Sequence, residues 1–357
     1  MTDVMTDHVL PDLHSGALDD LADPLLGDGA RAAVHRQPLQ GAAQQAWLAA
    51  AGGLAAVADR VAGAYLGLAL GDALGATVEF MTPREIALRH GVHQQICGGG
   101  WLRLKAGQVT DDTTMSLALG EGLLHGAAAS DGRSLDLGEV AESFLTWWRA
   151  RPVDCGNTCR RGILRYLHGG TLQGPPQEGD AGNGAAMRVL PAAIATLGDP
   201  LAFTAIALGQ ARITHHHPLS DSAVLGLGGL AQALIAGADE ADIARRIERW
   251  QAAQPLFRHA PYPGRASAYV VDTVQTVLDA YTRHDDFRQA VVTAVNRGDD
   301  ADTTGALVGM LAGARCGARA LPRDWLQRLQ PTVREAVTDQ AAALLALALQ
   351  PLPGEAR

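Results

Sequence analysis

The chain has 357 residues and a mass of 37.3 kDa; 47% of the residues are hydrophobic and 19% are charged, enough for one large domain with a substantial core. A formal charge of −9 and a pI of about 5.7 are unlike the basic face of a general nucleic-acid binder, so we expect no nucleic-acid partner. Lys105 is the only lysine and lies in no Gly-x-x-x-x-Gly-Lys-Ser/Thr run, which excludes phosphate-loop enzymes and Schiff-base lysine enzymes.

The cysteine content and the N-terminal residues indicate the cellular compartment of the protein. Four cysteines in a chain of this length do not make a disulfide scaffold, and we interpret Cys155 and Cys159, one helical turn apart, as ordinary buried thiols rather than as a thiolate metal site. The N-terminal residues are acidic and lack the basic start of a signal peptide. The long apolar run near 61–78 is interrupted by Asp72, so no stretch reaches 18 apolar residues. We therefore expect a soluble, cytoplasmic protein without direct membrane insertion.

The spacing of apolar residues predicts an all-α fold. Residues 1–40 show no sustained period and are expected to be flexible; with a short Ala-rich helix at 42–58 they form an N-terminal extension over 1–58. From there on, apolar residues recur at helical spacing and strand signals are scarce, which predicts a single helical domain over 59–350. The expected helices are 60–74, 113–126, 136–150, 157–168, 184–197, 201–210, 219–236, 239–252, 268–282, 286–296, 303–318 and 325–349.

Two acidic blocks each precede an apolar helical run. They read Thr-Asp-Asp-Thr-Thr at 110–114 and Gly-Asp-Asp-Ala-Asp-Thr-Thr at 298–304. Asp and Thr at a helix start often cap free backbone N–H groups, each cap contributing about 1 kcal/mol. Capping accounts for one or two such residues per helix, whereas clusters of two and three aspartates repel one another unless a cation lies between them. The matched pair favours a metal site over capping.

The side chains of these blocks limit the metal. Carboxylates and Thr hydroxyls are hard oxygen donors, which suit Mg²⁺ or Mn²⁺ better than Zn²⁺. Five carboxylates are enough to neutralise two divalent ions, and two ions about 3.5–4 Å apart can bridge and activate one water for hydrolysis. The sequence therefore predicts two Mn²⁺ or Mg²⁺ ions as cofactors.

Other polar residues lie in short turns between the predicted helices. Asp72 is either part of this chemistry or the polar end of its helix, and Glu79 is either an acid beside the metal ligands with a raised pKa or a surface residue. Asp154 lies in a turn ahead of a helix. The Gly-rich run 182–188 presents backbone N–H groups that suit a phosphate. The three histidines at 215–217 cannot easily all face one ion, so metal ligation and hydrogen bonding to a substrate both remain open.

Together these blocks resemble the ADP-ribosylglycohydrolase family. Each block is common by itself, but the ordered set over about residues 60–330 is highly specific. Asp299 stands where the family more often has Gly, and we interpret it as an exposed residue rather than a ligand. The matching stretches are 64–75 with Glu79, 98–102, 109–113, 154–157, 182–188, 214–215, 267–273 and 296–305.

The resemblance implies an all-α fold that holds two Mn²⁺ or Mg²⁺ ions in a cleft and cleaves ADP-ribose from a modified protein side chain. It implies that Asp154 and Glu79 act at the reacting ribose. The implied metal ligands are Thr110, Asp111, Asp112, Asp300, Asp302 and Thr303. The residues implied to hold ADP-ribose are Asn157, Asn183, Gly184, Met187, His215 and Tyr269, the last of which has a core tyrosine as its alternative interpretation.

The resemblance also implies a substrate and partners. The substrate is arginine-linked ADP-ribose on dinitrogenase reductase, in the regulation of nitrogen fixation. Cleaving this N-glycosidic bond develops positive charge on the ribose and needs a proton for the leaving guanidine, which Asp154 or Glu79 can carry. The implied partners are a PII signalling protein and, through it, an ammonium transporter at the inner membrane.

Three other functions fit the same residues. A family member could cleave another ADP-ribosyl linkage, such as one to serine. A non-catalytic ADP-ribose-binding regulator is a second alternative, although a binder does not need two intact metal clusters. A two-metal phosphoesterase could use the same oxygen ligands and would release AMP rather than ADP-ribose.

Overall fold

A computed structural model describes residues 33–352, which are mainly helical, so the all-α prediction is confirmed. The first elements in chain order are β1 (Ala33–His35), α2 (Gly41–Ala50), α3 (Leu54–Gly75), α4 (Pro83–His90), α5 (Asp111–Ala129), β2 (Ser134–Asp136), α6 (Leu137–Arg149), α7 (Asn157–Gly169) and α8 (Leu190–Ala195). They are followed by α9 (Pro200–Arg212), α10 (Pro218–Ile235), α11 (Glu240–Ala253), α12 (Val270–Arg283), α13 (Phe287–Val295), α14 (Ala301–Cys316), α15 (Arg323–Arg328) and α16 (Pro331–Leu349).

The helices differ from the sequence-based expectation in four places. The helix expected over 42–58 ends at Ala50, and α3 begins at Leu54 rather than at residue 60, so the expected boundary between 58 and 59 falls inside α3. The helix expected over 184–197 is confined to α8, because the residues before it form turns. The helix expected over 325–349 is divided into α15 and α16 at Pro331, which lacks an N–H and so suits the first position of a new helix. The analysis missed α4, which begins with a capping box: Thr82 Oγ1 accepts from Glu85 N, and the Glu85 carboxylate accepts from Thr82 N.

Glycines at every fourth residue bring α3 and α14 into backbone contact. A Cβ on Gly67 would lie 2.1 Å from Gly309 O, and one on Gly71 would lie 2.0 Å from Gly305 O, so no larger residue fits at these two positions. The contacts pair rising numbers on α3 with falling numbers on α14, so the two helices are antiparallel. This packing sets the end of α3 beside the start of α14, where the acidic residues lie.

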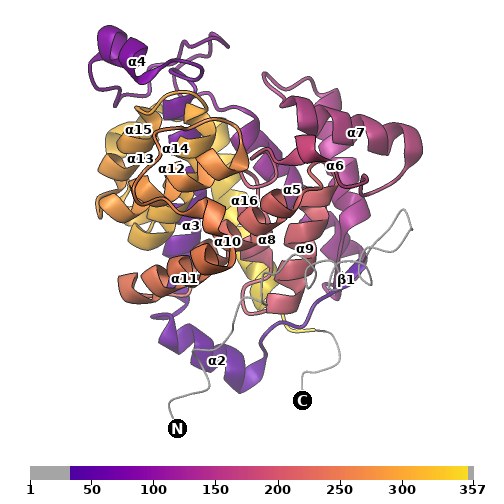
Figure 1. Cartoon of the computed structure of the whole chain (residues 1–357). Coiled ribbons are helices and arrows are strands. Elements are labelled where there is room, and N and C mark those ends of the chain that lie inside the picture. Colours follow the sequence, from indigo (N-terminus) through magenta and orange to yellow (C-terminus); the bar gives the residue numbers. More distant parts are fainter. Residues whose placement is uncertain (1–32, 353–357) are drawn as a thin grey trace.

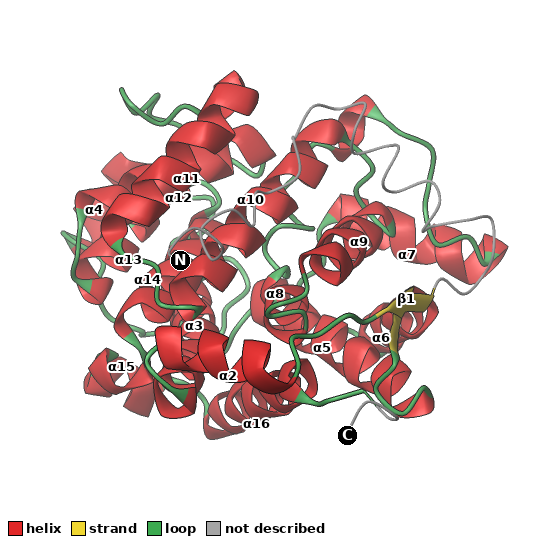
Figure 2. Cartoon of the chain, turned by 90° about the horizontal axis from the view of Figure 1, so that it is seen from below, coloured by secondary structure: helices red, strands yellow, loops and turns green. Residues whose placement is uncertain are grey.

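The other helices surround this central pair. Helices α11 to α14 gather on one side of the molecule, and α6, α7 and α9 gather on the other (Figure 1). Figure 2, seen from below, shows the same division and shows that the strand β1 lies beside α6. The loops that join α3 to α5, α6 to α7 and α12 to its preceding segment meet near the N-termini of α5 and α14.

The segment before α2 differs from the expected flexible extension in its described part. Residues 33–35 form an antiparallel pair with β2, in the register Ala33 opposite Asp136 and His35 opposite Ser134. The buried Arg36 side chain donates to Gly132 O at 2.5 Å and to Leu347 O at 2.5 Å. Residues 33–36 are therefore packed against the helical body, and residues 37–40 lead from them into α2. Residues 1–32 of the predicted flexible segment lie outside the described residues.

Replacing Arg36 by alanine should lower the free energy of unfolding by about 1–3 kcal/mol, because two buried carbonyls lose their hydrogen-bond donors. The predicted metal and ligand site should be unaffected, since the side-chain partners of Arg36, Gly132 and Leu347, are not among the predicted site residues. Arg133→Ala, which removes an exposed guanidinium on the neighbouring turn, is the matched control and should unfold like the wild type. Equal denaturation midpoints for the two variants would show that the Arg36 contacts contribute nothing.

Within residues 33–352, two helices are long and apolar enough to cross a membrane by length and composition alone. They are α3 and α10, and 61% and 89% of their most apolar windows are buried inside the fold. The α3 window packs through its glycines on α14, and α10 packs Gly226 against Trp250. Such burial is what the core helices of a helical domain show.

Candidate active site

The two acidic blocks lie at the N-termini of α5 and α14 and meet in space. Thr110 precedes α5 and Asp300 precedes α14, and neither side chain makes a capping hydrogen bond to its helix. Instead, Thr110 Oγ1 lies 3.2 Å from Asp112 Oδ2, and Thr303 Oγ1 donates to the same oxygen at 3.3 Å. Capping therefore does not explain these blocks, because their side chains bond to each other across 191 residues of sequence.

Asp72 lies at the centre of this junction, although it was not among the predicted site residues. Its carboxylate is fully buried and accepts from the backbone N–H groups of Thr110 and Thr113, at 2.9 and 3.1 Å, and from Thr113 Oγ1 at 2.5 Å. Burial raises the pKa of Asp72 to about 6, against the opposing effect of these bonds. The signal in the sequence was an aspartate inside an otherwise apolar helix, which is costly unless the carboxylate is fully bonded.

A second acidic group joins the two halves of the site. Oxygen atoms of Glu79, Asp300 and Asp302 all lie within 4.8 Å of one another, and all three residues are buried. Asp300 accepts from Asn183 Nδ2 at 2.6 Å, which ties it to the Gly-rich loop. The structure therefore places Glu79 among the predicted metal ligands rather than apart from them.

These residues fit a divalent cation. Every donor is a carboxylate or hydroxyl oxygen, and within the described residues the buried Asp112 Oδ1 has no hydrogen-bond partner. Burial and neighbouring carboxylates raise the pKa of Asp112 and Asp302 well above the usual range, and they raise that of Asp111 to about 7. Such a group of carboxylates favours its ionised form only with positive charge beside it.

The residue after Glu79, Phe80, and its hydrogen-bond partner Asp299 both have a strained backbone. Phe80 has φ 61° and Asp299 has φ 50°, both in the left-handed region that favours glycine. Phe80 N donates to Asp299 O at 2.7 Å, and Asp299 N donates to Met81 O at 2.9 Å, so each strained residue holds the other. The Asp299 side chain is exposed, as expected, and its positive φ is a physical reason for a glycine to be common at this position.

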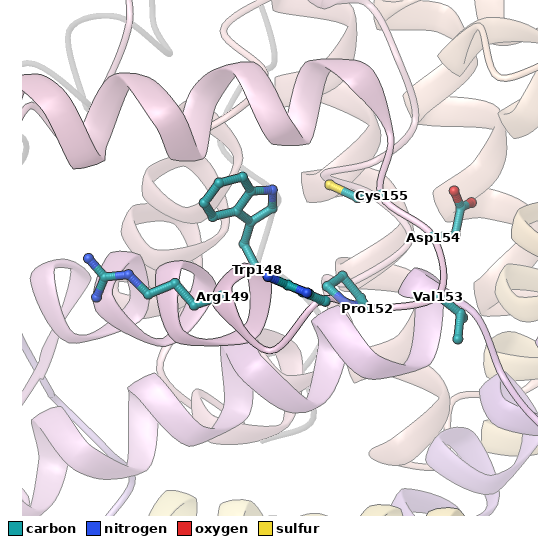
Figure 3. Close-up of a pocket in the computed structure, with 7 residues that line it drawn as sticks. Trp148, Arg149, Pro152, Val153, Asp154 and Cys155 are labelled. Carbon is teal, nitrogen blue, oxygen red and sulfur yellow. The ribbon is translucent and has the colours of Figure 1, made fainter.

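Asp154 lies outside the acidic cluster, in the loop between α6 and α7. Figure 3 shows its carboxylate on the far side of a pocket of about 510 Å³ from Trp148 and Arg149. The next-but-one residue, Gly156, donates its N–H to Asp111 Oδ2 at 3.2 Å and so joins this loop to α5. Burial, more than the charge of Asp300, raises the pKa of the half-buried Asp154.

The residues predicted to hold ADP-ribose fall into two groups. Gly182 and Tyr269 form an isolated bridge, and Asn183 N donates to Ala268 O at 3.1 Å, so the Gly-rich loop lies along the start of α12. A Cβ on Gly184 would lie 2.9 Å from the His215 ring, which makes these two residues neighbours.

The remaining members of this set differ in exposure. Met187 is buried, Tyr269 is 43% exposed, and Asn157 is an exposed first residue of α7. The exposure of Tyr269 is unlike that of a core tyrosine, its alternative interpretation.

The three neighbouring histidines do not converge. Nδ1 of His215 pairs with Thr214 Oγ1 at 2.8 Å, Nδ1 of His216 with Gly174 O at 2.5 Å, and Nδ1 of His217 accepts from Leu219 N. Burial and the charge of nearby arginines lower the pKa of His215 well below its usual value, so its ring is neutral. Of the two alternatives, this geometry favours hydrogen bonding over a shared metal.

Arg188 is a buried residue whose importance the sequence did not reveal. Its guanidinium donates to Gly184 O, to Gln210 Oε1 and to Thr214 Oγ1, each at 2.8 Å. These bonds connect the Gly-rich loop to the segment that carries His215. Arg188 is fully buried, so it positions the loop from inside the fold.

The family model for ADP-ribosylglycohydrolase matches residues 54–353. The chain belongs to the ADP-ribosylglycohydrolase family. The family prediction is thereby confirmed, and with it the prediction of a hydrolase. Metal dependence is a general property of this family, in agreement with the acidic cluster.

Similar proteins come from several sources. The ADP-ribosyl-[dinitrogen reductase] glycohydrolase of Rhodospirillum rubrum is 54% identical over 292 residues, 82% of this chain and 97% of that protein. The ADP-ribosylarginine hydrolase Tri1 of Serratia proteamaculans is 33% identical over 286 residues, 76% of this chain and 75% of that protein. A solved structure named ADP-ribosylglycohydrolase-related protein complex superposes with a TM-score of 0.71 at 33% identity, covering 83% of this chain and all of that one.

In the presence of a chelator, which removes the metal ions, this ADP-ribosylglycohydrolase should lose thermal stability as the pH rises from about 5 to about 8. Burial raises the pKa of Glu79 to about 8 and that of Asp111 to about 7, so the metal-free fold holds protons that the unfolded chain releases near pH 4. Between these values the unfolded chain binds fewer protons, and the free energy of unfolding therefore falls with rising pH.

Thermal unfolding at both pH values, with chelator and with saturating Mn²⁺, checks this prediction. The cation should reduce the loss, because it stabilises the ionised carboxylates. A melting temperature that stays constant or rises with pH in chelator contradicts the raised pKa values.

Proposed function

We propose that this chain removes ADP-ribose from an arginine side chain of a protein and that its substrate is ADP-ribosylated dinitrogenase reductase. The proposal is supported by the relative from Rhodospirillum rubrum, whose name states that activity, and by the arginine hydrolase Tri1. The observation that carries it is the buried group of Glu79, Asp300 and Asp302, in contact with a loop suited to the substrate through Asn183. This arrangement is suited to hydrolysis at a ribose rather than to binding alone.

Two Mn²⁺ or Mg²⁺ ions are the proposed cofactors. The residues that would hold them are Thr110, Asp111, Asp112, Asp300, Asp302 and Thr303, with Glu79 beside them. When bound, the ions supply positive charge for the ribose hydroxyls and activate a water. The positive ends of α5 and α14 also point to this place and stabilise the carboxylates there.

Asp154 is the proposed proton carrier. Departure of the guanidine needs a proton, and attack by water releases one. A carboxylate outside the cation cluster keeps its proton affinity, and the raised pKa of Asp154 suits this exchange. Glu79 lies within 4.8 Å of two predicted metal ligands, which favours a role at the metals and leaves Asp154 as the better candidate.

The ADP-ribose moiety is proposed to lie along Asn157, Asn183, Gly184, Met187, His215 and Tyr269. A neutral His215 can donate one hydrogen bond without placing a charge beside Arg188. The exposed ring of Tyr269 offers a face to the adenine or the ribose.

A product assay tests the proposed function. The protein, supplied with Mn²⁺, is incubated with ADP-ribosylarginine and ADP-ribosylserine peptides, and the products are weighed by mass spectrometry. We expect ADP-ribose from the arginine peptide and no reaction after chelation. Release of AMP would indicate a phosphoesterase, preference for serine would indicate a different linkage, and binding without turnover would indicate a regulator.

The proposed location is the cytoplasm. We also propose, from the family resemblance, that the protein contacts a PII signalling protein and, through it, an ammonium transporter at the inner membrane.

A further inference from the structure

Two exposed aromatic side chains lie at the rim of the acidic cluster. Phe80 is 65% exposed and Trp101 is 51% exposed, and their ring centroids are 5.3 Å apart at an interplanar angle of 53°. Trp101 Nε1 donates to Glu79 Oε2 at 2.5 Å. Since Glu79 belongs to the acidic cluster, this aromatic corner, formed by Phe80 and Trp101, is continuous with the cluster on its solvent side.

The contribution of Phe80 to folding does not explain the corner. Its backbone has φ 61°, which is unfavourable for a bulky side chain, and its ring remains largely in water. A glycine would adopt the same backbone without strain. Strained residues that are kept in place by their surroundings cluster at functional sites, so the exposed ring of Phe80 calls for a binding role.

We propose that Phe80 and Trp101 bind the guanidinium group of the ADP-ribosylated arginine, the part of the substrate that leaves on hydrolysis. The inference rests on the proposed function. With the reacting ribose at the carboxylates, the modified arginine must extend outward, because the protein that carries it stays outside. The aromatic corner is exposed and contacts Glu79, so it offers the arginine a surface beside the carboxylates.

The chemistry of the corner matches this occupant. A guanidinium group is planar and positively charged, and it stacks on aromatic faces more often than the ammonium group of lysine does. Two tilted rings provide such faces, and the adjacent carboxylate of Glu79 adds charge complementarity. A serine linkage is uncharged at this position and offers nothing to stack, so the corner makes the enzyme prefer arginine.

Steady-state kinetics of four proteins test the inference with ADP-ribosylarginine, and with free ADP-ribose as a product inhibitor. Phe80→Leu keeps an apolar side chain but loses the aromatic face, and its KM should rise about tenfold with a smaller change in kcat. Phe80→Tyr keeps the face and should stay within about twofold of the wild type. Leu201→Ala, at a 60% exposed site on α9, is the control and should have wild-type kinetics.

The inhibition constant of ADP-ribose separates recognition of the leaving group from damage to the site. ADP-ribose lacks the guanidinium, so its inhibition constant should be the same in every variant. A fifth protein, Phe80→Gly, relieves the strained backbone and should unfold at a temperature no lower than the wild type while sharing the raised KM of Phe80→Leu.

Each other outcome overturns the inference. An inhibition constant that rises together with KM would show that Phe80 acts on ADP-ribose or on the shape of the site. A wild-type KM in Phe80→Leu would show that no aromatic face is used. If the wild-type protein releases no ADP-ribose from ADP-ribosylarginine, the proposed function fails as well. If the wild-type protein does release ADP-ribose and the Phe80 variants have wild-type kinetics, only the proposed role of the aromatic corner is refuted.

Discussion

Replacing Asp302 by asparagine is expected to lower metal affinity and the rate of hydrolysis together, each by about a hundredfold or more. Asp302 is buried, lies within 4.8 Å of Glu79 and Asp300, and accepts a hydrogen bond from Thr303 N at 2.9 Å. Asparagine keeps the size of the side chain but removes one negative charge from the cluster. Calorimetric titration with Mn²⁺ and single-turnover hydrolysis of ADP-ribosylarginine measure the two effects.

The matched control is Asp299→Asn. This substitution removes the same charge three residues earlier in the chain, from an exposed side chain. It should leave both metal affinity and rate within about twofold of the wild type, as surface substitutions generally do. Normal metal binding in Asp302→Asn, or equal losses in both variants, would be inconsistent with Asp302 as a ligand.

Replacing Asp154 by asparagine should separate proton transfer from metal binding. The variant should bind two metal ions and ADP-ribose almost normally but hydrolyse about 10²–10⁴-fold more slowly, the usual contribution of a general acid or base. The physical reason is that Asp154 lies in the loop after α6, apart from the group of Glu79, Asp300 and Asp302. Asparagine retains the hydrogen-bonding shape but accepts no proton.

Glu79→Gln is the comparison that decides between the two carboxylates. If Glu79 acts at the metals, this variant should lose metal affinity, which Asp154→Asn should retain. A variant Asp154→Asn that fails to hold metal, or that hydrolyses at nearly the wild-type rate, would transfer the role of proton carrier to Glu79. The same titration and single-turnover measurements serve for both variants.

Local sequence patterns determined the helices well where no tertiary contact was needed. Apolar spacing predicted the segments that became α5, α6, α7 and α9 to within a few residues, because α6 and α7 bury one face each and α5 and α9 are apolar and buried over most of their length. The same spacing joined α15 to α16, since apolar residues continue through the break at Pro331. It also missed the pairing of β1 with β2, because three residues per strand are too few to show a period.

The candidate site was predicted from motifs in part. The two acidic blocks and the Gly-rich loop were found because several carboxylates at a helix start have few structural explanations. Asp72, Trp101 and Arg188 were not assigned to the site, since each belongs to an apolar or loop segment in which a single polar residue carries no pattern. Each of them has a partner 22 to 41 residues away in sequence, and only folding brings such pairs within bonding distance.

The sequence by itself determined the all-α class and the family, and it predicted the oxygen-bearing residues that are proposed to hold Mn²⁺ or Mg²⁺. Only the tertiary structure decided which carboxylates share a site. Backbone contact between Gly67 on α3 and Gly309 on α14 sets the two helices antiparallel, so that Glu79, which follows α3, meets Asp302 at the start of α14. Side-chain types follow from local sequence, whereas distances between them follow from packing, which depends on residues far apart in the chain.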